Sequence, residues 1–531
     1  MKQNQWVKRL AVGGAFIAML CIGVITNNYS TATASSGPVV RTSEGDIRGK
    51  TINDARAFLG VPFAKPPTGE LRWKVPAQPV AWHGTRDATK FKSPCAALPL
   101  PPKVGIPSRN GSTNEDCLYL NVYTPKKTHN KTPVMVFIHG GGFQNGAGSD
   151  HEADVMAAKG DAIVVTLNYR MGPFGFLALP SLTAENSQGT SGNLGILDQQ
   201  AALKWVKRNI AKFDGNPDNV TLFGISAGGR SICSHLISPA AAGLFDRAVI
   251  ESSPCIRPVK TLATAESEGA TIATQAGCTD PVTQLTCLRS KSTTEILAAG
   301  GNTIGTWAPN VDGVVIPDQF GAAVNSGKLY EVPVMQGTTH DEYLWHVTIG
   351  FDGAGSPVTT AQYPELIQSM FGAAAQPQIL AKYPVGDYPS PSKALARLVT
   401  DARYSCPARA TNQLLSQHVP TFAYEFNDRN APDYLWEGLR GPVHAAETPY
   451  LFRAANAVSS GYFTPEQGKL SDQLIRYWST FAQKGSPNQT STPAWPAYAE
   501  QSDKIQSLQP GNTRPITNFA TDHNCSFWNS L

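Results

Sequence analysis

The stretch Val220-Thr-Leu-Phe-Gly-Ile-Ser-Ala-Gly-Gly-Arg230 places a serine between glycines directly after an apolar run. The run from Val220 to Phe223 predicts a short buried strand, and the residues SICSHLISP that follow (231–239) are compatible with a helix. In a G-x-S-x-G pentad at a strand-to-helix turn, small flanking residues allow a sharp bend that projects the serine oxygen above a sheet. Because the chain contains 47 glycines, such a pentad also arises by chance. Ser226 is therefore a candidate nucleophile that needs an acid, a histidine and an oxyanion hole elsewhere.

Apolar runs alternate with helical stretches on both sides of this pentad. The uncharged runs indicate buried strands of a mostly parallel sheet, and the spacing of apolar residues in 194–213 predicts a helix. This alternation predicts an α/β fold, a large mostly parallel sheet covered by helices on both faces. No repeat or linker divides the chain, so we expect a single domain over residues 35–531. The expected strands are TPVMVFIHG (132–140), DAIVVTLNY (161–169), DRAVIESS (246–253), EVPVMQGTT (331–339) and PTFAYEFN (420–427).

The first 34 residues have the pattern of an export signal. Lys2, Lys8 and Arg9 precede sixteen uncharged residues, LAVGGAFIAMLCIGVI (10–25), and Ala32-Thr33-Ala34 offers an A-x-A cleavage site. The alternative is an uncleaved membrane anchor, because the apolar run approaches the minimum length of a membrane span. We expect residues 1–34 to be a signal peptide and the mature chain to be exported, either secreted or periplasmic.

The charge balance argues against nucleic acid as a partner. The formal net charge of +4 falls to about +1 without the three N-terminal cations, which leaves no electrostatic attraction for a polyanion. No later segment of the sequence is apolar enough to span a membrane, so we expect no stable membrane association after signal removal. The oligomeric state stays open.

The cysteine spacing predicts disulfides, which an exported chain can form. Eight of the nine cysteines lie outside the signal segment. Cys95 and Cys117 bracket one loop, Cys278 and Cys287 bracket a shorter one, and Cys406 with Cys525 could tie the C-terminus to the body. Cys233 and Cys255 are left as buried thiols or a fourth bridge. No Cys/His spacing indicates zinc, and we expect no metal.

A glycine-rich run supplies a candidate oxyanion hole. His139-Gly140-Gly141-Gly142-Phe143 follows an expected strand, and three glycines leave backbone N–H groups free to point at one spot. Such donors stabilise the charge that develops on a carbonyl oxygen by about 3–4 kcal/mol each in measured cases.

These motifs together resemble a known family. HGGGF (139–143), GISAGG (224–229), EDCLYLNVYTP (115–125), NYRMGPFGF (168–176) and CSFW (525–528) are similar to the motifs of type-B carboxylesterases, the cholinesterase-like branch of the α/β-hydrolases. The resemblance covers nearly the whole mature chain. It implies the α/β-hydrolase fold and hydrolysis of carboxylic esters to acid and alcohol.

The resemblance also implies a catalytic triad. Its nucleophile falls on Ser226, its acid on Glu342 in GTTHDE (337–342) and its base on His444 in GPVHAAE (441–447), in the Ser–acid–His order of the fold. His444 would take the serine proton, while Glu342 would orient the imidazole. The oxyanion donors correspond to the amides of Gly141, Gly142 and Ala227.

Neighbouring residues offer alternatives to these assignments. His340 and His346 flank the acid and are alternative bases, although a surface or core position suits both better. Asp341 is an alternative acid, and Glu447 is expected as a buried partner near the site.

The sequence departs from the family at two positions. Ile225 stands where glutamate is common, and Tyr343 follows the acid where glycine is usual. The first change removes a carboxylate that would stabilise the cationic histidine, and the second could reshape the acid loop.

The resemblance further implies structural pairs. Two ion pairs are expected, Arg72 with Glu115 and Arg170 with Asp198. Three disulfides are expected, namely Cys95–Cys117, Cys278–Cys287 and Cys406–Cys525.

The substrate is constrained only in part. Besides a general esterase, the alternatives are a lipase for long acyl chains and a non-catalytic binding protein such as the family's adhesion members. A choline ester fits poorly, because residues 96–116 contain no aromatic side chain to hold an ammonium group. Thr303 and Gly305 align approximately with bulky acyl-pocket residues of cholinesterases, which favours acyl groups larger than acetyl, although Trp307 could wall the pocket. The expected partner is a small ester, with water as second substrate and no cofactor.

Overall fold

A computed structural model describes residues 37–301, 306–452 and 463–531. Residues Gly37–Leu531 form one compact unit. The expected signal segment, residues 1–34, lies outside the described residues, as do Thr303 and Gly305. Within the described ranges, no helix is both long and apolar enough to cross a membrane.

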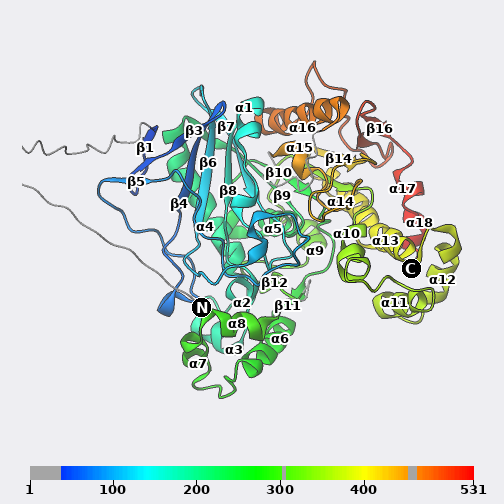
Figure 1. Ribbon diagram of the computed structural model, residues 1–531, viewed down its shortest axis with the longest axis horizontal. Helices are drawn as coiled ribbons and strands as arrows, with labels where there is room; N and C mark the ends of the chain where they lie inside the picture. The colour runs from blue at the N-terminus through cyan, green and yellow to red at the C-terminus, as the bar shows by residue number, and fades with distance from the viewer. Residues whose placement is uncertain (1–36, 302–305, 453–462) are drawn as a thin grey trace, which may run out of the picture. The chain divides into compact units, whose positions relative to one another are not determined.

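The core of the molecule is an eleven-stranded sheet (Figure 1). Its seven strands from β8 to β15 in the sheet order pair in parallel, and antiparallel strands complete both edges. The predicted α/β-hydrolase fold with a mostly parallel sheet is therefore confirmed. In sheet order the strands are β16 (Arg514–Ile516), β15 (Ile505–Leu508), β14 (Thr421–Phe426), β13 (Val334–Thr339), β10 (Arg247–Glu251), β9 (Gly215–Ile225), β7 (Thr132–Ile138), β8 (Ile163–Leu167), β6 (Tyr119–Pro125), β4 (Ala55–Pro62) and β3 (Lys50–Ile52).

Strand β9 is longer than its apolar run predicts. It begins at Gly215 rather than near Val220, because the polar residues before Val220 continue the strand and Gly215 pairs with Thr132 of β7. Two small sheets lie apart from the main one. They consist of β1 (Val39–Arg41), β2 (Asp46–Arg48) and β5 (Thr85–Asp87), and of β11 (Lys260–Thr261) and β12 (Asn310–Val311).

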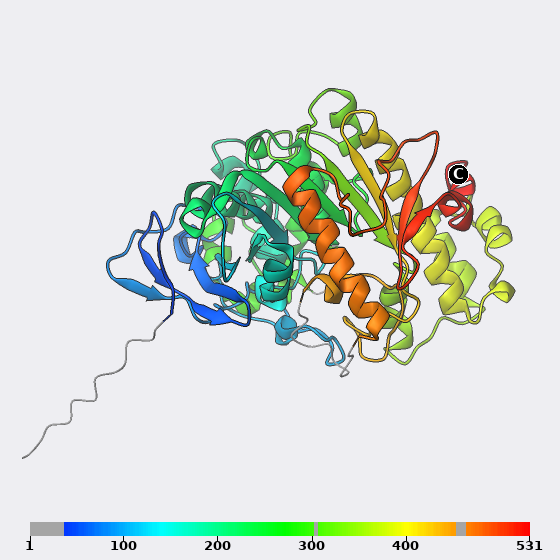
Figure 2. The ribbon, with the colours of Figure 1, turned by 90° about the horizontal axis from the view of Figure 1, so that it is seen from above.

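The period-two pattern of the strands divides the core between the two faces of the sheet. On β7, Val134, Val136 and Ile138 pack in one cluster with residues of α4 (Leu194–Asn209) and α5 (Ala227–Ile237). Met135 and Phe137 face the opposite cluster, which contains residues of α1 (Asp154–Gly160) and α16 (Pro465–Lys484). Figure 2 shows α16 (orange) lying across the strands. Helices therefore cover both faces, as predicted.

The C-terminal segment returns to the carboxyl ends of β13 and β14. Helix α13 (Pro391–Thr400) continues through a π-helical turn, η8 (Asp401–Ser405), into α14 (Cys406–Ser416). The short helices α17 (Phe519–Asp522) and α18 (Cys525–Trp528) lie beside them (Figure 1). A disulfide between Cys406 and Cys525 joins the two groups.

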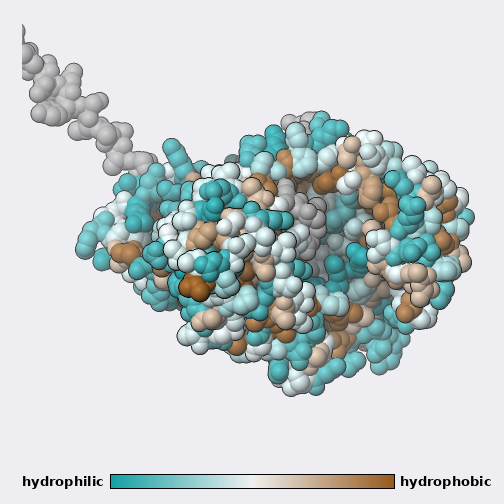
Figure 3. Space-filling view, turned by 90° about the horizontal axis from the view of Figure 1, so that it is seen from below, coloured by the Kyte–Doolittle hydropathy of each residue, from teal (hydrophilic) through white to brown (hydrophobic). Residues whose placement is uncertain are grey.

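Covalent and ionic links fix the loops around the sheet. The disulfides are Cys95–Cys117, Cys278–Cys287 and Cys406–Cys525, and a fourth bridge, Cys233–Cys255, joins the pair whose state the sequence left open. The buried ion pairs are Arg72–Glu115, at 2.5 Å, and Arg170–Asp198, at 2.7 Å. On the face shown in Figure 3, hydrophobic residues are scattered among hydrophilic ones.

Candidate active site

Ser226 occupies a strained turn between β9 and α5. Its φ of 58° and ψ of −118° lie in a region that L-residues rarely adopt, at a cost of about 1–3 kcal/mol. The flanking glycines are required by close packing, because a Cβ at Gly224 or Gly228 would lie 2.6 or 1.9 Å from the carbonyl oxygen of Ile138. The G-x-S-x-G pattern therefore has a steric cause in this structure, and the turn directs Ser226 to the edge of the sheet.

A cavity of about 250 Å³ opens beside Ser226. Its wall includes the glycine-rich run that follows β7 and the histidine from the loop after β14. Carboxyl ends of parallel strands meet at one edge of a sheet, which explains why segments far apart in the sequence converge here. Among the residues that line it are Gly140, Gly141, Gly142, Ser226 and His444.

A buried carboxylate contacts the histidine that lies in the wall of this cavity. Nδ1 of His444 lies 2.5 Å from Oε2 of Glu342, and both side chains are buried. The second carboxylate oxygen of Glu342 accepts a hydrogen bond of 2.8 Å from the amide of Thr339. The carboxylate is thereby fixed at both oxygens, and it orients the imidazole so that Nε2 remains for proton transfer. Among the described residues, Ser226 Oγ makes no hydrogen bond to His444.

Two residues of the glycine-rich run adopt backbone conformations that favour glycine. Gly141 and Gly142 adopt φ values of 107° and 63°. A Cβ at Gly141 would lie 2.0 Å from the carbonyl oxygen of Asn145, so only glycine fits this turn. Ala227 is the first residue of α5, and an amide at this position has no acceptor within its own helix. These three amides belong to the segments that flank Ser226.

The structure separates the alternative residues from the pair. Asp341 Oδ1 lies 2.6 Å from Nδ1 of His340, and Asp341 Oδ2 lies 3.7 Å from Arg429, so neither oxygen serves His444. Nε2 of His340 faces Asp522 at 3.0 Å. His340 and Asp341 thus belong to another cluster of side chains.

His346 lies in the cavity wall, which the sequence interpretation as a surface or core residue missed. Its ring centroid is 5.3 Å from that of His444, and burial together with the nearby His444 holds its pKa well below the usual value. A neutral imidazole therefore packs against the base. Two further aromatic rings lie near the imidazole of His444: the ring centroids of Trp345 and Tyr404 are 6.1 and 5.8 Å from its own. His346 lies only four residues after Glu342 in the sequence, and this proximity was the available signal.

The two departures from the family have visible consequences. Ile225 is almost fully buried and lines the cavity, so its wall is apolar next to Ser226. Tyr343 stacks on His346 with a centroid distance of 4.8 Å, and its amide donates to Thr400 Oγ1 at 2.9 Å. Tyr343 therefore helps to fasten the acid loop to α13.

Glu447 is buried close to this site, as expected. The hydroxyl of Tyr424 donates to it at 3.4 Å, and Glu251 is a second buried carboxyl group in the same region. Burial raises the pKa of Glu447 well above its usual value and that of Glu251 to about 7. Both groups therefore favour the protonated form more than ordinary carboxylates do.

Three features show that the protein is an α/β-hydrolase with a serine mechanism. They are the strand order, the serine on the strained turn after β9 and the loop of Glu342 after β13. A profile of the carboxylesterase family matches residues 36–528, and the chain belongs to this family. It is a carboxylic-ester hydrolase.

Characterised relatives cover the chain almost completely. Acylcarnitine hydrolase of Mus musculus is 33% identical over 97% of this chain and 95% of that protein. Para-nitrobenzyl esterase of Bacillus subtilis (strain 168) is 35% identical over 87% of this chain and 93% of that protein. Among solved structures, a PNB esterase superposes with a TM-score of 0.77 at 32% identity, over 93% of this chain and 100% of that one. The similarity therefore extends over the whole fold and not over the motifs alone.

Proposed function

We propose that Ser226, His444 and Glu342 carry out the ester hydrolysis. In this mechanism His444 removes the serine proton as Oγ attacks the ester carbonyl, and then delivers it to the leaving alcohol. Water attacks the resulting acyl-enzyme with His444 acting again as base. The contact that carries the proposal is the 2.5 Å Glu342–His444 pair in the cavity of Ser226, because Glu342 fixes the tautomer and stabilises the imidazolium.

Backbone amides stabilise the tetrahedral intermediates in the same proposal. Gly141, Gly142 and Ala227 are the donors, and they act on the oxygen that becomes negative when Ser226 adds to the carbonyl. The place of both glycines in the cavity wall beside Ser226 supports this role, as do their positive φ values, which favour glycine. No cofactor is required, since water completes the reaction.

A fluorophosphonate probe tests the assignment directly. Wild-type protein should be labelled on Ser226, whereas folded Ser226→Ala should be neither labelled nor active. His444→Ala should be labelled at a rate lower by about 10³-fold or more, since the probe also needs an activated serine. Full ester turnover by folded Ser226→Ala would contradict the assignment. Absence of labelling and turnover in the wild type would favour the alternative, a non-catalytic binding protein.

The cavity wall favours neutral esters over choline esters. The loop closed by Cys95–Cys117 contributes Leu100, Pro101, Val104 and Ile106 to the wall, all of them aliphatic. Ile225 lines the cavity where a carboxylate would attract a cation. Trp345 and Tyr434 do supply aromatic surface from other segments. Asp150 is the one acidic side chain among the described residues of the wall, and burial raises its pKa to about 6, so it favours the neutral form more than an ordinary carboxylate does.

The size of the acyl group that the cavity accepts is also part of the proposal. Trp307 lies beside Gly172 and Gly300 and, within the described chain, is not part of the cavity wall. This supports acyl groups larger than acetyl. A panel of neutral esters that varies the acyl and alcohol parts separately tests this, and the alternative of a lipase predicts highest kcat/KM for long acyl chains.

We also propose that the protein is exported. The four disulfides support an oxidising compartment. On this proposal residues 1–34 are removed and residues 35–531 form the mature single domain. N-terminal sequencing of the exported protein tests the cleavage site, and a membrane-bound product that retains residue 1 would support the anchor instead.

A further inference from the structure

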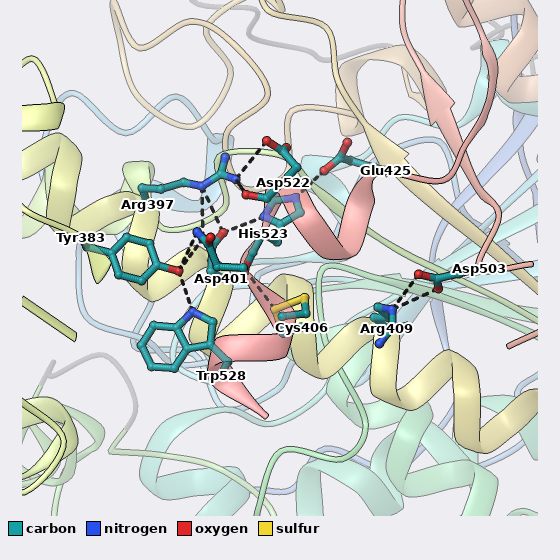
Figure 4. The surroundings of a disulfide bond; sticks show 12 residues. Tyr383, Arg397, Asp401, Cys406, Arg409, Glu425, Asp503, Asp522, His523 and Trp528 are labelled. Atoms are coloured by element: carbon teal, nitrogen blue, oxygen red, sulfur yellow. Dashed lines mark hydrogen bonds and ion pairs between the residues drawn. A yellow bond between two sulfur atoms is a disulfide. The ribbon is translucent and has the colours of Figure 1, made fainter. Parts of the chain in front are cut away.

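A cluster of charged side chains adjoins the loop of Glu342 and involves no residue of the proposed triad. Part of it is shown in Figure 4, beside the Cys406–Cys525 disulfide. We call it the C-terminal charge cluster. Its members are His340, Asp341, Arg397, Asp401, Glu425, Arg429, Asp522 and His523.

His523 forms the buried centre of the C-terminal charge cluster. Its Nδ1 lies 2.6 Å from Asp401 of η8, and its Nε2 lies 2.7 Å from Glu425 of β14. Carboxylates only accept hydrogen bonds, so both ring nitrogens must carry protons to satisfy both contacts. His523 is thus an imidazolium that joins the segment between α17 and α18 to the sheet and to η8 (Figure 4).

His340 links this segment to the acid loop. Asp522 of α17 contacts Nε2 of His340 at 3.0 Å, and Asp341 contacts Nδ1 at 2.6 Å. Two guanidinium groups share these carboxylates, because Arg397 lies 3.5 Å from Asp522 and Arg429 lies 3.7 Å from Asp341. Asp341 immediately precedes Glu342, so the contacts end one residue from the acid.

Asp341 also connects the acid loop to the loop of His444. Its amide donates to the carbonyl oxygen of Pro442 at 2.8 Å, and Asp341 forms an isolated parallel bridge with Val443. The side chain of Asp341 therefore belongs to the cluster, while its backbone pairs with the residues just before His444. A displacement at His340 would change the relative position of acid and base.

A metal ion is the alternative occupant of the cluster. Single ligand atoms of His340, Glu425, Asp522 and His523 all lie within 4.8 Å of one another, and two imidazoles with two carboxylates suit zinc. However, the guanidinium of Arg397 lies 3.2 Å from Nε2 of His340. The four carboxylates of the cluster already face two arginines and two histidines as partners. The cluster is complete without a metal.

We propose that His340 and His523 are positioning residues, which hold the loop of Glu342 against the loop of His444 through Asp341. The short C-terminal helices then contribute to catalysis without contacting substrate. The inference depends on the proposed roles of Glu342 and His444. On this inference, disturbing the cluster lowers kcat and leaves substrate binding unchanged.

The test compares His340→Gln and His523→Gln with Arg409→Gln as matched control. Arg409 of α14 pairs with Asp503 at 2.9 Å near the same disulfide (Figure 4), and among the described residues this ion pair involves no member of the acid loop. For a neutral ester we expect kcat of both histidine variants to fall by about 10- to 100-fold, as misplacement of catalytic groups does, with KM within about twofold. Arg409→Gln should keep both constants within about twofold of wild type.

Two substitutions at Asp522 provide a second test. The side chain of Asp522 is 43% exposed, so we expect both variants to fold. Asp522→Asn should lower kcat severalfold, and Asp522→Glu should restore most of it. Near-UV circular dichroism and unfolding curves check that each variant is folded.

Several outcomes would overturn the inference. These are unchanged kcat in folded His340→Gln and Asp522→Asn, an equal loss in Arg409→Gln, or an effect confined to KM. Stoichiometric zinc in the purified wild type that is lost in His523→Gln would show instead that the cluster is a metal site. The proposed triad would be contradicted by a different result, namely activity in folded Ser226→Ala. The two proposals can therefore fail independently.

Discussion

Raising the pH from 6.5 to above 9 should destabilise the protein through His523. Burial lowers the pKa of this imidazole, but its hydrogen bonds and charge interactions with Asp401 and Glu425 outweigh burial and raise the pKa to about 9. The folded-state pKa lies above the ordinary value of 6.5, so the stabilisation is fully present below pH 6.5 and is lost as the pH rises through 9.

The size of the effect follows from the two pKa values. A rise from 6.5 to about 9 corresponds to roughly 3 kcal/mol, and no reduction for solvent screening applies because His523 is fully buried. Several charged groups surround the ring. They are Asp401, Glu425 and Asp522 on the acidic side, with Arg397 as the nearest arginine of the cluster.

The assay is urea unfolding of wild type and His523→Gln at pH 6 to 10 with the disulfides intact. Glutamine cannot carry the charge, so the difference in unfolding free energy between the two proteins isolates the contribution of His523. We expect this difference to be larger by about 3 kcal/mol at pH 6 than at pH 10. A difference that is independent of pH would refute the imidazolium assignment, even if His523→Gln were destabilised throughout.

Three further predictions concern the site. Combining Ser226→Ala with Glu342→Ala should reduce kcat little beyond Ser226→Ala alone, because triad residues act as a unit; losses that multiply would contradict this. Ile225→Glu should move the acidic limb of kcat/KM to higher pH, since a carboxylate favours cationic His444; a move to lower pH would show the wrong sign. Burial raises the pKa of Glu251 from 4.5 to about 7, so its ionisation destabilises the folded protein above that range. Glu251→Gln should therefore stabilise the protein in urea unfolding by up to roughly 3 kcal/mol at pH 8 and by little at pH 4.5. The same stabilisation by Glu251→Gln at both pH values would argue against a costly buried charge.

The central strands could be predicted because burial on both faces imposes an apolar sequence. β7, β8 and β13 coincide with uncharged runs, and β10 and β14 each have an apolar core with only one or two charged residues. The start of β9 could not be predicted in this way, because residues 216–219 form no apolar run, and Gly215, which pairs with Thr132, has no side chain to signal a strand.

The site could be predicted only where a local motif exists. Ser226 and the glycine-rich run carry their own steric signature, whereas the meeting of Glu342 with His444 joins residues 102 apart and came from the family resemblance. His523 carries no local signature at all. Its carboxylate partners lie 122 and 98 residues away, so its role depends on contacts that only the folded chain creates.

The position of the C-terminal charge cluster has a physical reason. Glu342 and His444 stand on loops that have left the sheet, where strand pairing no longer fixes the backbone. Burying charged groups there gains little net stability, because desolvation offsets their attraction, but removal of one partner leaves the others uncompensated. Such a cluster therefore penalises every loop arrangement except the one that pairs all its charges. His340 transmits that preference to Asp341, whose backbone joins the acid loop to the base loop.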